Sequence, residues 1–184
     1  MRAPHVSRGF VLWFTGLSGA GKTTLADIVE PELEQRGFVV DHLDGDIVRT
    51  HLSQGLGFSK EDRDTKIARI AWVASRIARA GGVVIVSAIS PYAEARDRAR
   101  KLIEPHAPFV EVYVATPVEE CARRDPKGLY AKAFSGELSD FTGVSAPYEA
   151  PADPELRLDT SGATPTESAA RVIDRLTELS LVGG

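Results

Sequence analysis

Hydrophobic side chains gather in four short runs, at residues 10–14, 38–40, 83–86 and 110–114. The runs are rich in β-branched and aromatic residues, and segments of helical length separate them. Runs of this kind are typical of strands buried on both faces of a parallel sheet. The pattern therefore predicts a strand in each run and a helix in each crossover.

The segments between the runs carry helical spacing. From residue 67 to residue 78, apolar residues recur at intervals of three and four, so one stripe would face the core, and Gly81 and Gly82 end the pattern. A last amphipathic helix is predicted at residues 169–179. Pro31 lies inside the helical pattern of residues 23–36, where we expect a kink or an early break.

Strand and helix alternate, which predicts an α/β fold with three α/β/α layers and a mainly parallel central sheet. Residues 125–154 interrupt the alternation, because they are punctuated by Gly and Pro and carry Phe134, Phe141 and Tyr148. We interpret this segment as a functional lid. No repeat or boundary divides the chain, so residues 1–184 are expected to form a single domain.

Composition excludes several classes of function. The formal net charge of -4 argues against a general nucleic-acid or membrane surface, although a local basic pocket remains compatible with it. Cys121 is the only cysteine, which rules out an intramolecular disulfide and is typical of a reducing cytosol. Residues 1–10 are too polar for a signal peptide, and no apolar run reaches the ~18 to 20 residues of a membrane span. We expect a cytoplasmic location.

The first predicted strand leads into a glycine-rich segment that matches G-x-x-x-x-G-K-[ST] and opens a helix. In such a loop the backbone amides surround phosphate, the lysine reaches the β- and γ-phosphates, and the hydroxyl binds Mg²⁺. The alternative is an ordinary glycine-rich turn with a solvated lysine. The predicted ATP-binding residues are Gly16, Leu17, Ser18, Gly19, Ala20, Gly21, Lys22, Thr23 and the adjacent Thr24.

The chain contains no asparagine, so it lacks the N-K-x-D motif with which GTPases read guanine. Its short length and lid favour a phosphate-loop kinase that closes over a small substrate.

Two carboxylates, Asp44 and Asp46, follow the second strand run at the sheet edge where such folds bind ligands. One would orient or deprotonate an acceptor hydroxyl, and the other would hold Mg²⁺ through water, a role we give to Asp44 beside Thr23. The alternative is an Asp-Gly turn followed by Asp46 as a helix N-cap. The adjacent phosphate loop favours the functional interpretation.

Further motifs make a family resemblance specific. Residues 44–49, 56–59, 62–63, 89–92, 124–130, 141–143 and 147–149 are similar, in order, to motifs of the adenylylsulfate kinase family. The resemblance runs from about Gly9 to the last helix. It implies that ATP phosphorylates the ribose 3′-hydroxyl of adenosine 5′-phosphosulfate, giving 3′-phosphoadenosine 5′-phosphosulfate and ADP. It also implies a homodimer and an association with sulfate adenylyltransferase.

The resemblance assigns roles on the acceptor side. Arg49 and Arg63 would bind the phosphosulfate, and Phe58 and Phe141 would sandwich the adenine. Taken alone, each arginine is more typical of a surface residue, and core packing is the alternative for each phenylalanine. Beside them, the acceptor-binding residues implied by the resemblance are Asp46, Lys66, Ile89, Ser90, Lys127 and Leu129.

The resemblance also assigns the lid and the adenine end of ATP. Lys127 would complete the cationic site when the lid closes, with an exposed loop lysine as the alternative. Arg123 and Arg124, with the turn at residues 160–164, would lie near the ATP adenine, although the arginines alone fit a solvated charge cluster.

Ser90 has two interpretations. The family's serine at this position is described as phosphorylated, so the resemblance makes Ser90 a candidate catalytic residue along with Lys22, Asp44 and Asp46. The residue types favour a simpler interpretation, in which Ser90 is a helix N-cap and Pro91 is the first helical residue.

Two residues depart from the family pattern. Lys66 and Ile47 stand where the family commonly has asparagine, and both fall in the predicted acceptor pocket. They motivate an alternative, a kinase of the same fold with another hydroxylated anionic or nucleoside acceptor. A second alternative is a non-catalytic nucleotide-binding domain that regulates a partner such as sulfate adenylyltransferase.

Overall fold

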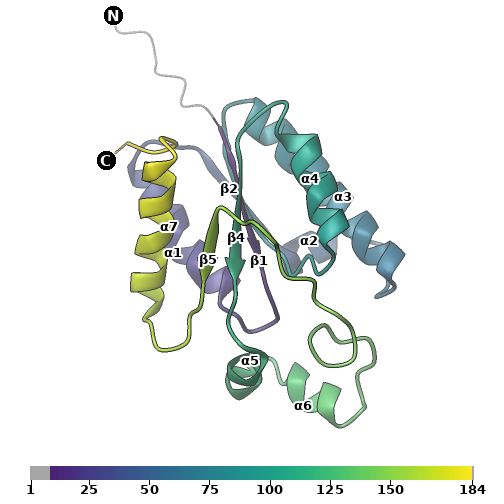
Figure 1. Cartoon of the computed structure of the whole chain (residues 1–184). Coiled ribbons are helices and arrows are strands. Elements are labelled where there is room, and N and C mark those ends of the chain that lie inside the picture. Colours follow the sequence, from purple (N-terminus) through teal and green to yellow (C-terminus); the bar gives the residue numbers. More distant parts are fainter. Residues whose placement is uncertain (1–8, 184) are drawn as a thin grey trace, which may run out of the picture.

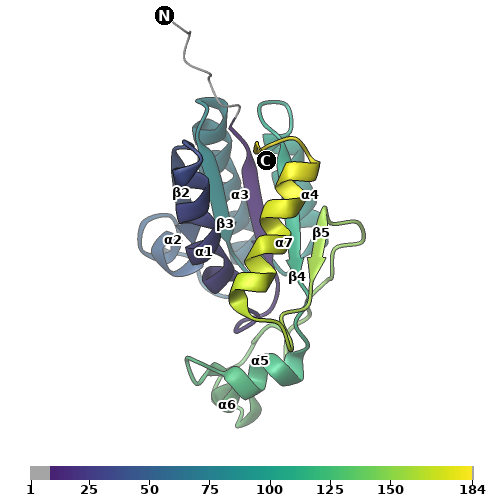
Figure 2. The same ribbon diagram turned by 90° about the vertical axis from the view of Figure 1, so that its left-hand side faces the viewer.

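The computed structural model describes residues 9–183, without the side chains of residues 46 and 47. Five strands form one parallel sheet in the order β2-β3-β1-β4-β5 (Figures 1 and 2). The strands are β1 (Val11–Thr15), β2 (Val40–Asp44), β3 (Val83–Ser87), β4 (Phe109–Val114) and β5 (Leu156–Leu158). The first four correspond to the predicted strands, although β2 begins only at the last residue of its predicted run, and β5 was not predicted. The predictions for residues 1–8 and 184 lie outside the described residues.

Helices cover both faces of the sheet, which confirms the three layers. They are α1 (Lys22–Gln35), α2 (Gly45–His51), α3 (Lys60–Arg79), α4 (Ala93–Ile103), α5 (Val118–Arg124), α6 (Leu129–Phe134) and α7 (Pro165–Glu178). α1 and α7 pack together on one face, and α3 and α4 pack on the other (Figures 1 and 2). Alternate residues of β1 enter the two cores, since Leu12 lies in one and Trp13 in the other.

The helix predictions hold with corrections at their ends. α3 buries the predicted stripe, begins at the N-cap Ser59 and stops before Gly81. α7 begins four residues before its predicted start, at a capping box between Thr164 and Glu167. Of the kink or early break expected at Pro31, the early break is wrong, because α1 continues to Gln35. Burial of Leu33 beyond the proline offsets the loss of one hydrogen bond.

The carboxyl ends of the strands point toward the segment predicted as a lid. α5 and α6 lie beyond this edge of the sheet in both views (Figures 1 and 2). α6 is a short helix inside the predicted lid, and irregular chain leads from it to β5. α2 begins at Gly45, so the alternative that made Asp46 an N-cap is wrong. Among the described residues, no helix combines the length and apolar character needed to cross a membrane.

Candidate active site

The phosphate loop has the backbone geometry of an anion-binding turn. Gly16 and Gly21 have φ values of 149° and 106°, which side-chain-bearing residues rarely adopt. A Cβ on Gly16 would lie 2.4 Å from the carbonyl oxygen of Val114, so only glycine fits there. Lys22 is buried, and its Nζ donates to the carbonyl oxygens of Gly16 (2.9 Å) and Leu17 (2.7 Å). These bonds place the ammonium group at the first turn of the loop.

Thr23 and Asp44 come together as predicted for a metal site. Thr23 Oγ1 donates to Asp44 Oδ2 at 2.8 Å, which joins the start of α1 to the end of β2. A hydroxyl beside a carboxylate supplies the hard oxygen ligands that Mg²⁺ prefers. The donor set therefore fits the predicted ion. The side chain of Asp46 lies outside the description, so its catalytic role stays a prediction.

A second part of the site lies on the far side of the phosphate loop. Thr116 and Thr160 both donate to the carbonyl oxygen of Ala20 at 3.0 Å, and Arg124 donates to Thr160 Oγ1 (2.8 Å) and O (3.0 Å). This arrangement borders a hollow of about 330 Å³. It is lined by Gly21, Thr24, Leu25, Arg124, Thr160, Ala163 and Pro165.

Arg124 and part of the 160–164 turn, both predicted near the ATP adenine, line this hollow together with Thr24, and their role toward the adenine stays a prediction. Arg123 instead lies largely exposed and pairs with Glu120 at 2.7 Å. Hydrogen bonds from Arg123 and Arg124 lower the pKa of Glu120 to about 2. The structure adds Thr116, whose position after a strand at the carboxyl edge of the sheet is the signal by which the sequence could have revealed it.

Three predicted acceptor residues cluster on the other side of the loop. The guanidinium of Arg49 lies 4.8 Å from the centroid of the Phe58 ring, and that ring is 59% exposed. An exposed ring beside a cation is available for stacking. Arg63 Nε donates to the carbonyl oxygen of Phe58 (2.8 Å) and its Nη1 to Thr142 Oγ1 (2.7 Å), while Nη2 donates to the carbonyl of Asp140. Arg63 thus ties α3 to the lid.

Lys66 lies beside the Asp44–Asp46 turn. Its Nζ donates to the carbonyl oxygen of Gly45 at 3.1 Å. The departure from the family pattern therefore puts a cation at the backbone between Asp44 and Asp46. The side chain of Ile47, the other departure, lies outside the description.

The prediction that Ser90 caps a helix is wrong. α4 begins at Ala93, and the amide of Ala93 is capped by Glu149 Oε2 at 2.8 Å. Ser90 has a φ of 42° and is 1% exposed. Its hydroxyl accepts from Trp13 Nε1 (3.1 Å) and donates to the carbonyl oxygen of Ala88 (3.3 Å). The carbonyl of the adjacent Ile89 accepts from Thr15 Oγ1 at 2.7 Å, which fixes this turn at the sheet edge.

The lid meets the phosphate loop through α6. Leu129 begins this helix, and Lys127 lies exposed in the turn before it. Tyr130 is buried, donates to the carbonyl oxygen of Ser18 at 2.9 Å, and meets the ring of Phe141 edge-on at 5.0 Å. Sequence analysis did not single out Tyr130 as a site residue, because a tyrosine in an aperiodic loop carries no signal of its partner.

A buried charged network holds the chain where the lid returns to the sheet. Arg96 is 3% exposed and donates to Glu111 Oε1 (2.9 Å) and to the carbonyl oxygens of Ser90 (2.6 Å) and Glu149 (2.6 Å). Burial raises the pKa of Glu111 above its ordinary value, although Arg96 and Arg100 oppose this. The network connects the Ser90 turn to the end of the lid.

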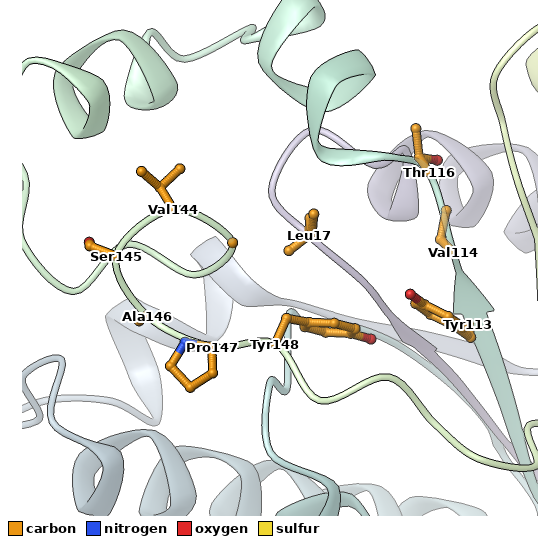
Figure 3. Close-up of a pocket in the computed structure, with 10 residues that line it drawn as sticks. Leu17, Tyr113, Val114, Thr116, Val144, Ser145, Ala146, Pro147 and Tyr148 are labelled. Carbon is orange, nitrogen blue, oxygen red and sulfur yellow. The ribbon is translucent and has the colours of Figure 1, made fainter.

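A larger hollow of about 510 Å³ lies between the phosphate loop and the lid (Figure 3). Leu17 points into it from the loop, Val144 borders it from the lid, and Tyr113 and Tyr148 form its floor. The Tyr113 and Tyr148 rings stack at 5.7 Å, and Tyr148 Oη lies 2.8 Å from Thr15 Oγ1. Of the predicted site residues, only Leu17 lines this hollow.

A phosphate loop between a central strand and a helix, a hydroxyl–carboxylate pair next to that loop, and two short helices beyond the carboxyl edge of the sheet define a phosphate-loop kinase. The family model described as adenylylsulphate kinase matches residues 8–159. The chain belongs to the adenylylsulphate kinase family.

Individual relatives agree with this assignment. The adenylyl-sulfate kinase of Halothermothrix orenii is 52% identical over 171 residues, which cover 93% of this chain and 91% of that protein. A probable bifunctional SAT/APS kinase of Sorangium cellulosum is 55% identical over 95% of this chain, which spans only 29% of that longer protein. The Mycobacterium tuberculosis APS kinase, solved in complex with AMPPNP and APS, matches with a TM-score of 0.89 and 47% identity over 92% of this chain and 98% of that chain.

Proposed function

We propose that this protein transfers the γ-phosphoryl group of ATP to the ribose 3′-hydroxyl of adenosine 5′-phosphosulfate. The observation that carries the proposal is the position of the Thr23–Asp44 pair, between a donor hollow and an acceptor side that bears Arg49, Phe58 and Arg63. An M. tuberculosis relative of the same fold has been solved with AMPPNP and APS.

The donor end is built for charge stabilisation. The phosphate loop would bind the polyphosphate through its amides, with the Lys22 ammonium beside the transferred group. Thr23 and Asp44 would hold Mg²⁺, the latter through water, and the bound ion would neutralise charge on the β- and γ-phosphates. The hollow beside Arg124 and Thr160 would take the donor base.

The acceptor end would orient its nucleotide with cations and aromatic rings. Arg49 and Arg63 would face the phosphosulfate, while Phe58 and Phe141 would stack on the base. Asp46, one residue from Gly45, would accept the proton of the 3′-hydroxyl as it attacks. Ser90 has no covalent role in this scheme, because its buried hydroxyl already makes two hydrogen bonds.

Turnover tests the proposal directly. ADP release would be measured with adenosine 5′-phosphosulfate and with a panel of nucleotides and sugar phosphates at equal concentration. We expect adenosine 5′-phosphosulfate to be the preferred acceptor. Turnover of another acceptor in its place would contradict the proposal and would point to Lys66 as the residue that changed the pocket.

The assembly is also a proposal. The S. cellulosum relative carries, by its name, SAT and APS kinase functions in one chain. We infer that this protein acts with a sulfate adenylyltransferase, which would supply its acceptor, and that it forms a homodimer. Sedimentation of the protein alone and with that enzyme measures both associations.

A further inference from the structure

One buried side chain, Tyr130 of α6, contacts both halves of the site. Its hydroxyl donates to the carbonyl oxygen of Ser18 in the phosphate loop at 2.9 Å. Its ring meets Phe141 edge-on, with centroids 5.0 Å apart and planes at 82°. Ser18 belongs to the loop for the donor, and Phe141 is the ring proposed to stack on the acceptor base.

The hydrogen bond to Ser18 bears on anion binding through the geometry of the peptide unit. The carbonyl of Ser18 and the amide N–H of Gly19 belong to one planar trans peptide, so they point in opposite directions. Holding the carbonyl against Tyr130 therefore fixes the direction of the Gly19 N–H, one of the loop amides available to phosphate. Burial raises the pKa of the Tyr130 hydroxyl, which stays a donor at neutral pH.

The backbone of Tyr130 is also fixed, by contacts at the start of α6. Asp125 accepts from the amides of Tyr130 (3.0 Å) and Ala131 (3.1 Å), which fixes the start of α6 at the end of α5. α5 in turn abuts the phosphate loop, since a Cβ on Gly19 would lie 3.2 Å from the carbonyl oxygen of Cys121. A rotation of the Ser18–Gly19 peptide is therefore transmitted to the Tyr130 side chain.

We propose that Tyr130 is a positioning residue that couples the donor and acceptor sites, an inference that rests on the proposed function. Phosphate bound to the Gly19 amide strengthens the bond between the Ser18 carbonyl and Tyr130. The better-ordered tyrosine ring then holds Phe141 where the acceptor base stacks. Coupling of this kind is reciprocal, so each substrate tightens the binding of the other by the same factor.

The test is calorimetric titration with adenosine 5′-phosphosulfate, in the absence and presence of AMPPNP, of the wild type, Tyr130→Phe and Ser135→Ala. Tyr130→Phe keeps the ring but removes the bond to Ser18. Ser135→Ala removes a hydroxyl at the other end of α6 that bonds only within the lid, to Lys132 and Glu137. Thermal unfolding of each variant checks that the fold is retained.

We expect AMPPNP to tighten acceptor binding about three- to tenfold in the wild type and in Ser135→Ala, the range one hydrogen bond accounts for. In Tyr130→Phe this ratio should fall toward one, because the bond that links the loop to the ring is gone. A wild-type ratio of one, or an unchanged ratio in Tyr130→Phe, would overturn the inference. A wild type that binds no adenosine 5′-phosphosulfate would instead contradict the proposed function, and the inference with it.

Phe141→Leu tests whether Tyr130 acts on acceptor binding through the Phe141 ring. It should weaken acceptor binding with and without AMPPNP, and adding Tyr130→Phe should remove no further coupling in that background. Independent, additive losses in the double variant would show that the two rings do not act together and would contradict the inference.

Discussion

At the residue scale, the strongest chemical feature is the contact between Thr23 and Asp44. Their oxygens lie 2.8 Å apart although they come from different elements, so the fold brings the pair together at the carboxyl edge of the sheet. Lys22 precedes Thr23 in α1, and its ammonium group lies at the Gly16 and Leu17 carbonyls of the phosphate loop. A metal–phosphate complex would meet donors that are already in position.

Asp44→Asn tests this arrangement. The amide oxygen still accepts from Thr23, but the negative charge that holds Mg²⁺ is lost, so kcat/KM should fall by about a hundredfold or more. The rate should also require a higher Mg²⁺ concentration. Asp41→Asn, an exposed substitution on the same strand, is the control, and initial rates across a Mg²⁺ series give the comparison. Equal behaviour of the two variants would disprove the metal role.

Ser90→Ala tests whether Ser90 has a structural or a catalytic role. Removing the hydroxyl leaves the buried indole N–H of Trp13 without its acceptor, which should cost about 1–3 kcal/mol of unfolding free energy. Turnover should stay close to wild type. Urea unfolding and kcat are measured in parallel, with the buried Ser75→Ala in α3 as control. Loss of turnover at unchanged stability would show that Ser90 takes part in the reaction.

At the scale of elements, the lid is attached at both of its ends. α6 bonds to the phosphate loop through Tyr130, and the returning chain is held by α4 through Arg96 and Arg100. Arg100 makes two hydrogen bonds of 2.8 Å to the carboxylate of Glu155, just before β5. The short strand β5 is therefore supported by charged contacts as well as by pairing with β4.

Glu155 gives this attachment a pH dependence. Burial alone would raise its pKa, but hydrogen bonds from Arg100 and from the Glu111 amide hold the pKa below its ordinary value of 4.5. A lowered pKa contributes stability that is present above pH 4.5 and is lost as the pH falls through the folded-state value. Glu111, whose pKa is raised, acts in the opposite sense.

Glu155→Gln should therefore lower the free energy of unfolding at pH 7 by about 1–3 kcal/mol. In this variant the free energy of unfolding should also decrease less steeply as the pH drops below the ordinary carboxyl pKa. Glu104→Gln removes an exposed partner of the same arginine and should have little effect on either quantity. Urea unfolding at a series of pH values measures both. An unchanged acid limb in Glu155→Gln would contradict the assignment.

Some elements left little trace in the sequence. β5 has three residues and too few apolar positions to show a pattern, and its place is set by pairing with β4 and by Arg100. α6 has only six residues, which is too short to show helical periodicity, so the pattern indicates a loop. The helix starts after Gly128, and Asp125 accepts from its first amides. The predictions of a helix break at Pro31 and of an N-cap at Ser90 failed for a related reason. In both, burial of neighbouring residues outweighed the local conformational preference of the proline or the serine.

At the scale of the whole molecule, the sequence predicted what depends on periodicity and motifs. The layers follow from the apolar runs, and the phosphate loop with Asp44 follows from spacing and from the shared edge of a parallel sheet. Contacts between distant segments could not be predicted, since nothing local links Arg63 to Thr142 or Tyr130 to Ser18.

The central claim is phosphoryl transfer to one hydroxyl of adenosine 5′-phosphosulfate. Phosphorus NMR and mass spectrometry of the product formed from ATP and adenosine 5′-phosphosulfate test it most directly, with Lys22→Ala as the inactive control. The account predicts one ADP for each product molecule and a new phosphate on the ribose 3′-oxygen. Release of inorganic phosphate without a phosphorylated acceptor, or a phosphate at another position, would contradict it.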